Sequence, residues 1–280
     1  MIINHLGISG GKDSTALLLW AVHESGYPLE SIRATFCDTG NEADETLDFV
    51  RMLSESVHPI EWIKPPLDYF ELVQKKGMFP SPRIRYCTQL LKLEPTKVHL
   101  YKMLEEGHEI LCHTGVRASE SHARASLDEH GFDEYMGLPV FRPLLRWSIA
   151  DVWAIHKRYG IEPNPLYAKG AKRVGCLPCM MSQKREIRRT AENWPEKIDK
   201  IREAEAKASG GRATFFAKDK IPIRFRTKEI TTTSGVVMNV ASIDDVVRWS
   251  HTGYRAEETP ELFEFEEEPS SCSHTSGACE

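Results

Sequence analysis

The residues of this chain that could do chemistry begin with the stretch Ser9–Ser14, which reads Ser-Gly-Gly-Lys-Asp-Ser. Its glycines let the backbone bend and approach a ligand without a Cβ in the way. Lys12 adds a positive charge, and the two serines add hydroxyl donors. This set of groups suits a phosphate or pyrophosphate, although an ordinary Gly-rich turn with a surface lysine is the alternative. The spacing differs from the Walker A pattern, which has four residues between its first glycine and the Gly-Lys pair.

Three further polar residues follow apolar runs that are typical of strands. Arg117 and Arg124 come after residues 109–113, and their guanidinium forks suit phosphate or sulfate. A solvated arginine pair is the alternative for these two. Asp38 comes after residues 32–37, where a carboxylate can bond a ribose hydroxyl or bind magnesium. The alternative is that Asp38 caps the turn that follows, as Asp-Thr-Gly often does.

Seven cysteines form the second group of reactive side chains. Cys176 and Cys179 form a Cys-x-x-Cys pair in a Gly/Pro turn, which places two sulfurs for one metal or cluster; a redox pair is the alternative. Cys87 lies beside arginines that favour its thiolate, or it is a half-buried thiol in a loop. Cys112 lies within an apolar run and is expected in the core. Because the chain starts without an export signal, metal, cluster or catalytic roles outrank disulfides.

The elements that must position these residues alternate between strand and helix. Strands are expected at 2–8, 32–37, 59–63 and 109–113, with helices after residue 15 and over 42–56. This alternation predicts a doubly wound, mostly parallel α/β sheet with helices on both faces. Ligands of such sheets bind at the carboxyl ends of the strands. We therefore expect Ser9–Ser14, Asp38 and Arg117 on one edge.

The remaining segments predict a small C-terminal appendage. Residues 77–95 read as an irregular, Pro-rich basic segment, and Ser148 is expected to cap a helix with Asp151. Residues 182–209 predict a charged helix broken near Trp194 and Pro195, and residues 231–240 predict a hairpin. The expected domains are 1–182, 183–256 and an acidic, Cys-containing tail at 257–280. A basic cluster in the charged helix is either a solvated face or a footprint for a nucleic acid: Lys184, Arg185, Arg188 and Arg189.

Composition narrows the class of protein. A chain of 280 residues with 41% hydrophobic residues can fill one large α/β domain with an appendage. The net charge of −5 argues against a wholly basic nucleic-acid binder. No run of about 18 apolar residues predicts a membrane span, and the N-terminus leads straight into the first strand without a signal peptide. These features predict a cytoplasmic protein.

The Ser9–Ser14 stretch resembles the PP-loop of the adenine nucleotide α-hydrolase superfamily. From Ile2 to about Cys179, the order of motifs is similar to the phosphoadenosine phosphosulfate (PAPS) reductase family. The matching motifs are Ser9–Ser14, Asp38-Thr39-Gly40, Cys87 with Lys92-Leu93-Glu94-Pro95, Gly115-Val116-Arg117 with Glu120 and Arg124, Pro143-Leu144 with Trp147, Asp151-Val152-Trp153, Pro165-Leu166-Tyr167, and Gly175-Cys176 with Cys179.

The resemblance implies an adenine nucleotide, either ATP or PAPS/APS with Mg²⁺, and chemistry at or near its α-phosphate. It also implies a [4Fe–4S] cluster held by Cys87, Cys176 and Cys179, with zinc as the alternative metal. Thr88 replaces the second cysteine of the family's tandem pair, so Cys272 or Cys279 is the candidate for the fourth ligand. The residues expected to bind the nucleotide are Ser9, Gly10, Gly11, Lys12, Asp13, Ser14, Asp38, Gly115, Arg117 and Arg124.

Three activities remain open at this point. The intact loop favours an ATP pyrophosphatase that adenylates an acceptor and is linked to sulfur transfer, with Lys12, Asp13 and Arg117 as catalytic residues. The alternative is a PAPS/APS sulfonucleotide reductase, in which a tail cysteine, Cys272, attacks sulfur and thioredoxin releases sulfite. A non-catalytic nucleotide- or metal-binding module is the third. The implied partners are the adenine nucleotide, a sulfur donor or thioredoxin, a nucleic-acid acceptor and, for the oligomeric state, a homodimer.

Overall fold

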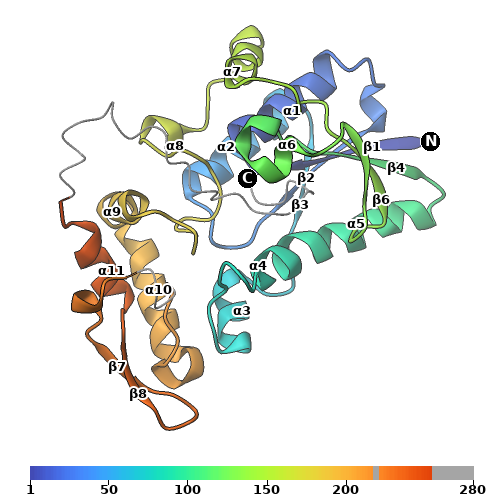
Figure 1. Ribbon diagram of the computed structural model, residues 1–280. Helices are drawn as coiled ribbons and strands as arrows, with labels where there is room; N and C mark the ends of the chain where they lie inside the picture. Colours follow the sequence, from blue (N-terminus) through green and yellow to red (C-terminus); the bar gives the residue numbers. More distant parts are fainter. Residues whose placement is uncertain (217–220, 254–280) are drawn as a thin grey trace. The chain divides into compact units, whose positions relative to one another are not determined.

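The computed structural model describes residues 1–216 and 221–253 and divides them into two compact units (Figure 1). The first unit comprises Met1–Pro66 and Thr88–Cys176. The second comprises Leu67–Cys87 and the described residues from Leu177 onward. The second unit thus includes residues 67–87, which the sequence places in its first predicted domain. The acidic tail, with Cys272 and Cys279, lies outside the described residues.

The first unit is built on a six-stranded sheet in the order β3-β2-β1-β4-β6-β5. Its strands are β1 (Ile2–Ile8), β2 (Ile32–Cys37), β3 (Ile60–Ile63), β4 (Glu109–His113), β5 (His130–Asp133) and β6 (Leu138–Phe141). All neighbours pair in parallel except β5, which pairs antiparallel with β6 at the edge. The predicted doubly wound, mostly parallel sheet is therefore confirmed.

Helices cover both faces of this sheet because alternate residues of each strand point to opposite sides. Leu6 and Ile8 of β1 belong to the core shared with α1 (Lys12–His23), α2 (Asp44–Ser56) and α7 (Ile149–Arg158). Ile3 of the same strand belongs to a second core, shared with α5 (Glu94–Glu105). Shorter helical segments complete the unit: η1 (Leu29–Ser31), η3 (Ala118–Glu120), α6 (His122–Ala125) and α8 (Pro165–Ala168).

The order of the strands creates a topological switch point between β1 and β4. From β1 the chain proceeds outward to β2 and β3, and then returns to add β4 on the other side of β1. The parallel pairing of β1 with β4 brings the loops that leave these two strands to the same edge of the sheet. Crevices at such points are where open α/β sheets bind ligands.

The expectation of an irregular segment at 77–95 is wrong for its second half. Helical structure begins at α4 (Tyr86–Thr88) and continues through a π-helical turn, η2 (Gln89–Leu93), into α5. Pro95 is the second residue of α5, which comes directly after this π-helical turn. The widened π-helical turn ends with the amide of Glu94 donating to the carbonyl of Gln89. The proline signal therefore misled because the turn before it absorbs the irregularity.

The second unit packs helices with a small hairpin. Its elements are α3 (Tyr69–Lys76), α9 (Lys184–Asn193), α10 (Pro195–Lys207), η4 (Ala208–Gly211), η6 (Ile223–Phe225), β7 (Lys228–Thr231), β8 (Val237–Val240) and α11 (Ile243–Ser250). The predicted break falls between α9 and α10, and β7 pairs antiparallel with β8 as the predicted hairpin. Two cations of the basic cluster connect α9 to the end of α11: Lys184 Nζ lies 3.0 Å from Thr252 Oγ1, and Arg188 Nε donates to Ser250 O at 3.0 Å.

Among residues 1–216 and 221–253, no helix is both long enough and apolar enough to span a membrane.

Candidate functional site

The loop between β1 and α1 has a backbone shape that requires glycine at Gly10. Gly10 has φ +76°, in the left-handed region that favours glycine. A Cβ at this position would also lie 2.9 Å from Thr46 Cγ2 of α2. Within the loop, Ser9 Oγ lies 3.0 Å from Ser14 Oγ, and Ser14 Oγ donates to Gly11 O at 3.1 Å. The loop residues therefore stabilise one another and present the first turn of α1 at the switch point.

A buried ion-pair network follows directly from this loop. Asp13 Oδ1 accepts from Arg117 Nε at 2.6 Å, and Asp13 Oδ2 lies 2.7 Å from Lys12 Nζ. The side chains of Asp13 and Arg117 are only 4% and 8% exposed. The network thus joins the loop after β1 to the loop after β4 across the switch point.

A second carboxylate extends the network. Glu120 forms an ion pair with Arg124, and its Oε1 lies 3.8 Å from Arg117 Nη2. The Glu120 side chain also accepts from the backbone amide of Arg117 at 2.7 Å. Gly115 allows this loop to approach α1 closely, because a Cβ there would lie 3.0 Å from Asp13 O. Arg117 and Arg124 are both buried, so the alternative of a solvated arginine pair is wrong.

The charges of this network favour an anion. Three cations, Lys12, Arg117 and Arg124, are associated with two carboxylates. The first amides of α1 point to the same end of the helix, where the helix dipole adds a partial positive charge. Helix N-termini with such surroundings bind phosphate, sulfate and carboxylate groups.

Asp38 caps a turn at the end of β2. Its Oδ1 accepts from the amide of Gly40 at 3.0 Å, which is the arrangement expected of an Asp-Thr-Gly turn. The neighbouring Glu42, which the sequence did not single out, is more deeply buried: its carboxylate accepts from Thr39 Oγ1 at 2.7 Å and from the Thr39 amide at 3.0 Å. Only its position after a strand end could have indicated it.

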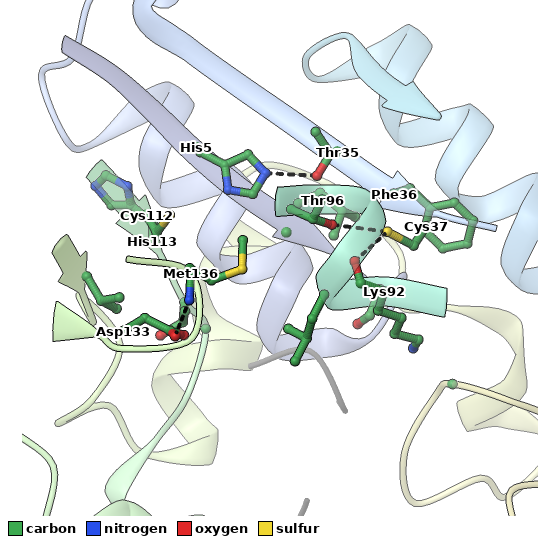
Figure 2. A pocket seen from close by; sticks show the side chains of 18 of the residues that line it. His5, Thr35, Phe36, Cys37, Lys92, Thr96, Cys112, His113, Asp133 and Met136 are labelled. Carbon is green, nitrogen blue, oxygen red and sulfur yellow. Dashed lines mark hydrogen bonds between the residues drawn. The ribbon is translucent and has the colours of Figure 1, made fainter. Parts of the chain in front are cut away.

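A pocket opens at the carboxyl ends of β1, β2 and β4, on the face that α5 covers (Figure 2). It encloses about 920 Å³ including the part that opens to solvent. Thr114 lines it; within the described residues its buried Oγ1 has no hydrogen-bond partner. An unsatisfied buried hydroxyl is unfavourable unless a ligand or water bonds it. Further lining residues are Ser9, Glu42, Lys92, Thr96, Asp133, Met136 and Gly175.

Burial shifts the pKa of two histidines and two cysteines that line this pocket. Burial lowers the pKa of His5 to about 3 and that of His113 to about 4. His5 is hydrogen-bonded to Thr35 Oγ1 at 2.9 Å, as Figure 2 shows. Burial also raises the pKa of Cys37, whose Sγ lies 3.3 Å from Thr96 Oγ1, and raises the pKa of Cys112 to about 12. Cys112 belongs to the core, as the sequence predicts.

The cysteines expected to hold a cluster do not form a metal site within the described residues. Cys176 belongs to the first unit, while Cys87 and Cys179 belong to the second. No group of three or more His, Cys, Asp or Glu side chains in residues 1–216 and 221–253 could hold a metal ion. The proposed fourth ligands, Cys272 and Cys279, are outside the described part. The iron–sulfur cluster, and zinc as its alternative, therefore stay predictions.

Three side chains from α7 and α8 contact the loop backbone. They are His156, Asn164 and Tyr167, which bond the backbone of Gly10 and Lys12. Sequence reasoning missed them as site residues, although Pro165-Leu166-Tyr167 is among the motifs of the resemblance. The available signal was the Asn-Pro pair, because Asn164 caps α8 through a bond from the Leu166 amide at 3.0 Å.

Comparisons with known proteins identify several relatives of this chain. An uncharacterized 37.8 kDa protein of Escherichia phage 186 is 33% identical over 275 residues, covering 79% of this chain and 81% of the phage protein. The adenosine 5′-phosphosulfate reductase of Burkholderia cepacia is 32% identical over 169 residues, covering 58% of this chain and 64% of that enzyme. An uncharacterized protein of Methanocaldococcus jannaschii is 31% identical over 195 residues, covering 69% of this chain but 45% of its own length.

Among solved structures, a phosphoadenylyl-sulfate (PAPS) reductase from Candida auris in complex with phosphate matches with a TM-score of 0.47 and 23% identity, covering 62% of this chain and 80% of that chain. The model of the phosphoadenosine phosphosulfate reductase domain matches residues 4–182, which include both loops of the switch point. With a match over that range, the chain belongs to the phosphoadenosine phosphosulfate reductase domain family.

Proposed function

We propose that this chain is a PP-loop enzyme that binds ATP at the β1/β4 switch point and cleaves it between the α- and β-phosphates. The observation that carries the proposal is the convergence of Lys12 and Arg117 on Asp13 at the first turn of α1. These cations come from the chain segments that follow β1 and β4, beside the switch point, where a nucleotide lies in open α/β sheets. The Thr114 hydroxyl, which has no hydrogen-bond partner among the described residues, and the pocket that it lines suit the nucleoside part of the ligand.

In this mechanism an acceptor oxygen attacks the α-phosphorus, the bond to the bridging oxygen of the β-phosphate breaks, and pyrophosphate leaves with that electron pair. The acceptor is then adenylated, and a sulfur nucleophile can replace the adenylated oxygen with release of AMP. Lys12 and Arg117 neutralise the negative charge that accumulates on the phosphates. The backbone of Ser9–Ser14 positions the phosphates. Catalysis of this kind rests on positioning and electrostatic stabilisation. We also predict that ATP binds as its Mg²⁺ complex. Magnesium usually binds through one or two carboxylates plus substrate phosphates.

Similarity to enzymes named adenosine 5′-phosphosulfate reductases supports a second candidate. In a sulfonucleotide reductase, a cysteine thiolate attacks the sulfur of the sulfonucleotide, and the bond from that sulfur to the phosphate oxygen breaks. The nucleotide leaves with that electron pair, and the cysteine keeps the sulfonate as a thiosulfonate. A thiol such as that of thioredoxin then supplies two electrons, releases sulfite and ends as a disulfide. The cysteine proposed for this role, Cys272, lies outside the described residues. The intact Ser-Gly-Gly-Lys-Asp-Ser loop at Ser9–Ser14 supports the ATP reaction as the first candidate.

Product analysis with ATP, APS and PAPS tests the proposal. We expect pyrophosphate from ATP in the presence of a nucleophilic acceptor and no sulfite from APS or PAPS. Arg117→Lys keeps the charge but loses the planar fork, so it should lower kcat/KM for ATP about tenfold or more. The matched control is Arg146→Lys, because the Arg146 side chain is 82% exposed and should tolerate the change. Sulfite from PAPS or APS, with no turnover of ATP, would establish the reductase instead.

A further inference from the structure

Three side chains from the segment that spans α7 and α8 form hydrogen bonds to the backbone of the loop between β1 and α1. His156 Nε2 lies 2.8 Å from the carbonyl oxygen of Lys12, and a carbonyl only accepts, so Nε2 carries the proton of this bond. Asn164 Nδ2 donates to the carbonyl of Gly10 at 3.2 Å. Both side chains are almost fully buried, at 2% and 1% exposure. They fix the direction of the loop's peptide groups.

The third contact differs because it involves a donor of the loop. The amide of Lys12 donates to the hydroxyl of Tyr167 at 2.9 Å. This amide belongs to the first turn of α1, whose N–H groups have no acceptor inside the helix and are the groups that bind anions at helix N-termini. The Tyr167 hydroxyl therefore accepts a hydrogen bond from an amide that a phosphate would be expected to use.

The same hydroxyl also lies close to Gly11 of the loop. A Cβ on Gly11 would be 3.7 Å from the Tyr167 oxygen, so the open side of the loop backbone faces the phenol. The ring of Trp153 packs against that of Tyr167 edge to face, with centroids 5.7 Å apart. Tyr167 is thus positioned by α7 on one side and by the loop on the other.

A phenol that accepts a hydrogen bond can also donate one, and accepting from a helix amide strengthens it as a donor. We propose that the Tyr167 hydroxyl is part of the phosphate site, where it accepts from the Lys12 amide and donates to a phosphate oxygen of the nucleotide. His156 and Asn164 are positioning residues that keep the Lys12 peptide group in place. This inference rests on the proposed nucleotide site and adds to it a neutral donor from a segment more than 150 residues away in sequence.

Calorimetric titration of the full chain with ATP, pyrophosphate and adenosine, and with PAPS in place of ATP if ATP does not bind, tests the inference. Tyr167→Phe removes only the hydroxyl, so it should weaken ATP and pyrophosphate binding about tenfold or more and leave adenosine binding within about twofold. Tyr159→Phe is the matched control, because the Tyr159 hydroxyl bonds Glu24 at the surface of the same unit at 3.0 Å. That variant should bind all three ligands as the wild type does.

The outcomes separate this inference from the proposed function. If the wild type binds ATP but Tyr167→Phe binds ATP and pyrophosphate equally well, the role of Tyr167 is overturned and the ATP site stands. An equal loss for adenosine and ATP in Tyr167→Phe would show that the residue only supports the fold of the site, which also overturns it. If the wild type binds PAPS but not ATP, the ATP reaction fails, and a selective loss of PAPS over adenosine in Tyr167→Phe still supports the inference. Wild-type protein that binds none of these anions overturns both.

Discussion

The two units of this chain use charged side chains in different ways. The described part of the first unit has 16 Lys and Arg against 21 Asp and Glu, whereas that of the second has 17 against 11. The acidic first unit nevertheless buries a network with more cations than carboxylates at its switch point. In the basic second unit, Arg202 bonds Asp244 and remains 49% exposed. Net charge therefore does not locate the anion site, because a few desolvated charges interact more strongly than many hydrated ones.

The largest expected difference between the units is in the free energy of unfolding after an arginine is removed. Arg117→Ala leaves the carboxylate of Asp13 buried without its guanidinium partner, which should cost about 3–5 kcal/mol. Arg202→Ala breaks exposed contacts in the second unit and should cost less than about 1 kcal/mol. Urea unfolding followed by fluorescence and circular dichroism measures both. Similar losses in the two variants would show that the Arg117 pair is as hydrated as the Arg202 pair.

The next effect concerns two glycines that share a left-handed backbone but differ in their surroundings. Gly10→Ala introduces both the left-handed strain and a Cβ 2.9 Å from Thr46 Cγ2, so we expect a loss of about 2–4 kcal/mol. Gly235, in the hairpin turn of the second unit, has φ +80°, and a Cβ added there would meet no atom of the described residues within 4 Å. Gly235→Ala should cost only the strain, about 1–2 kcal/mol. Thermal and urea unfolding compare them; equal losses would mean that α2 shifts away from the loop without cost.

The smallest expected effect is on how the free energy of unfolding depends on pH, which differs between the two units. Burial lowers the pKa of His113 to about 4, so the unfolded chain binds a proton below pH 6.5 that the folded chain does not. Stability should therefore fall as the pH drops, by about 2 kcal/mol between pH 7 and pH 5 from this residue. In the second unit, burial raises the pKa of Glu205, which acts in the opposite direction: its contribution is lost as the pH rises.

His113→Phe should flatten the acid side of the stability profile, because Trp20 and Phe141 already surround the ring with aromatic contacts. The control is His251→Gln at the surface of the second unit. Urea unfolding at several pH values measures the slope. A profile of His113→Phe as steep as that of the wild type would assign the acid sensitivity to other groups, with His5 the first to test.

Much of the first unit could be predicted because its signals are local. The bounds of β1, β2 and β4 agree with the apolar runs at 2–8, 32–37 and 109–113. Ser148 caps α7 through a capping box with Asp151, as the Ser-x-x-Asp spacing predicts. A buried parallel strand and a capped helix both depend on residues within a few positions of one another. Single-sequence patterns therefore describe them well.

The failures occurred where a tertiary contact or an unusual turn decided the outcome. Pro95 reads as a helix breaker, but the π-helical turn before it lets the chain enter α5. Glu42 was not singled out from the sequence, yet it is buried and lines the pocket. The predicted ligands Cys87, Cys176 and Cys179 are not among these failures, because the candidates for the fourth ligand, Cys272 and Cys279, lie outside the described residues. Their roles, and that of the tail, stay predictions.

The sequence by itself determined the strand, loop and helix around Ser9–Ser14 and the family to which the chain belongs, because both depend on neighbouring residues and on the order of motifs. Only the tertiary structure decided which distant side chains complete the site. Arg117 reaches Asp13 across 104 positions, and Tyr167 reaches Lys12 across 155. Arg117 can reach Asp13 because the parallel pairing of β1 with β4 brings the carboxyl ends of these strands to one edge. Tyr167 can reach Lys12 because the packing of α7 on α1 brings α8 to the loop. No local pattern encodes such distances.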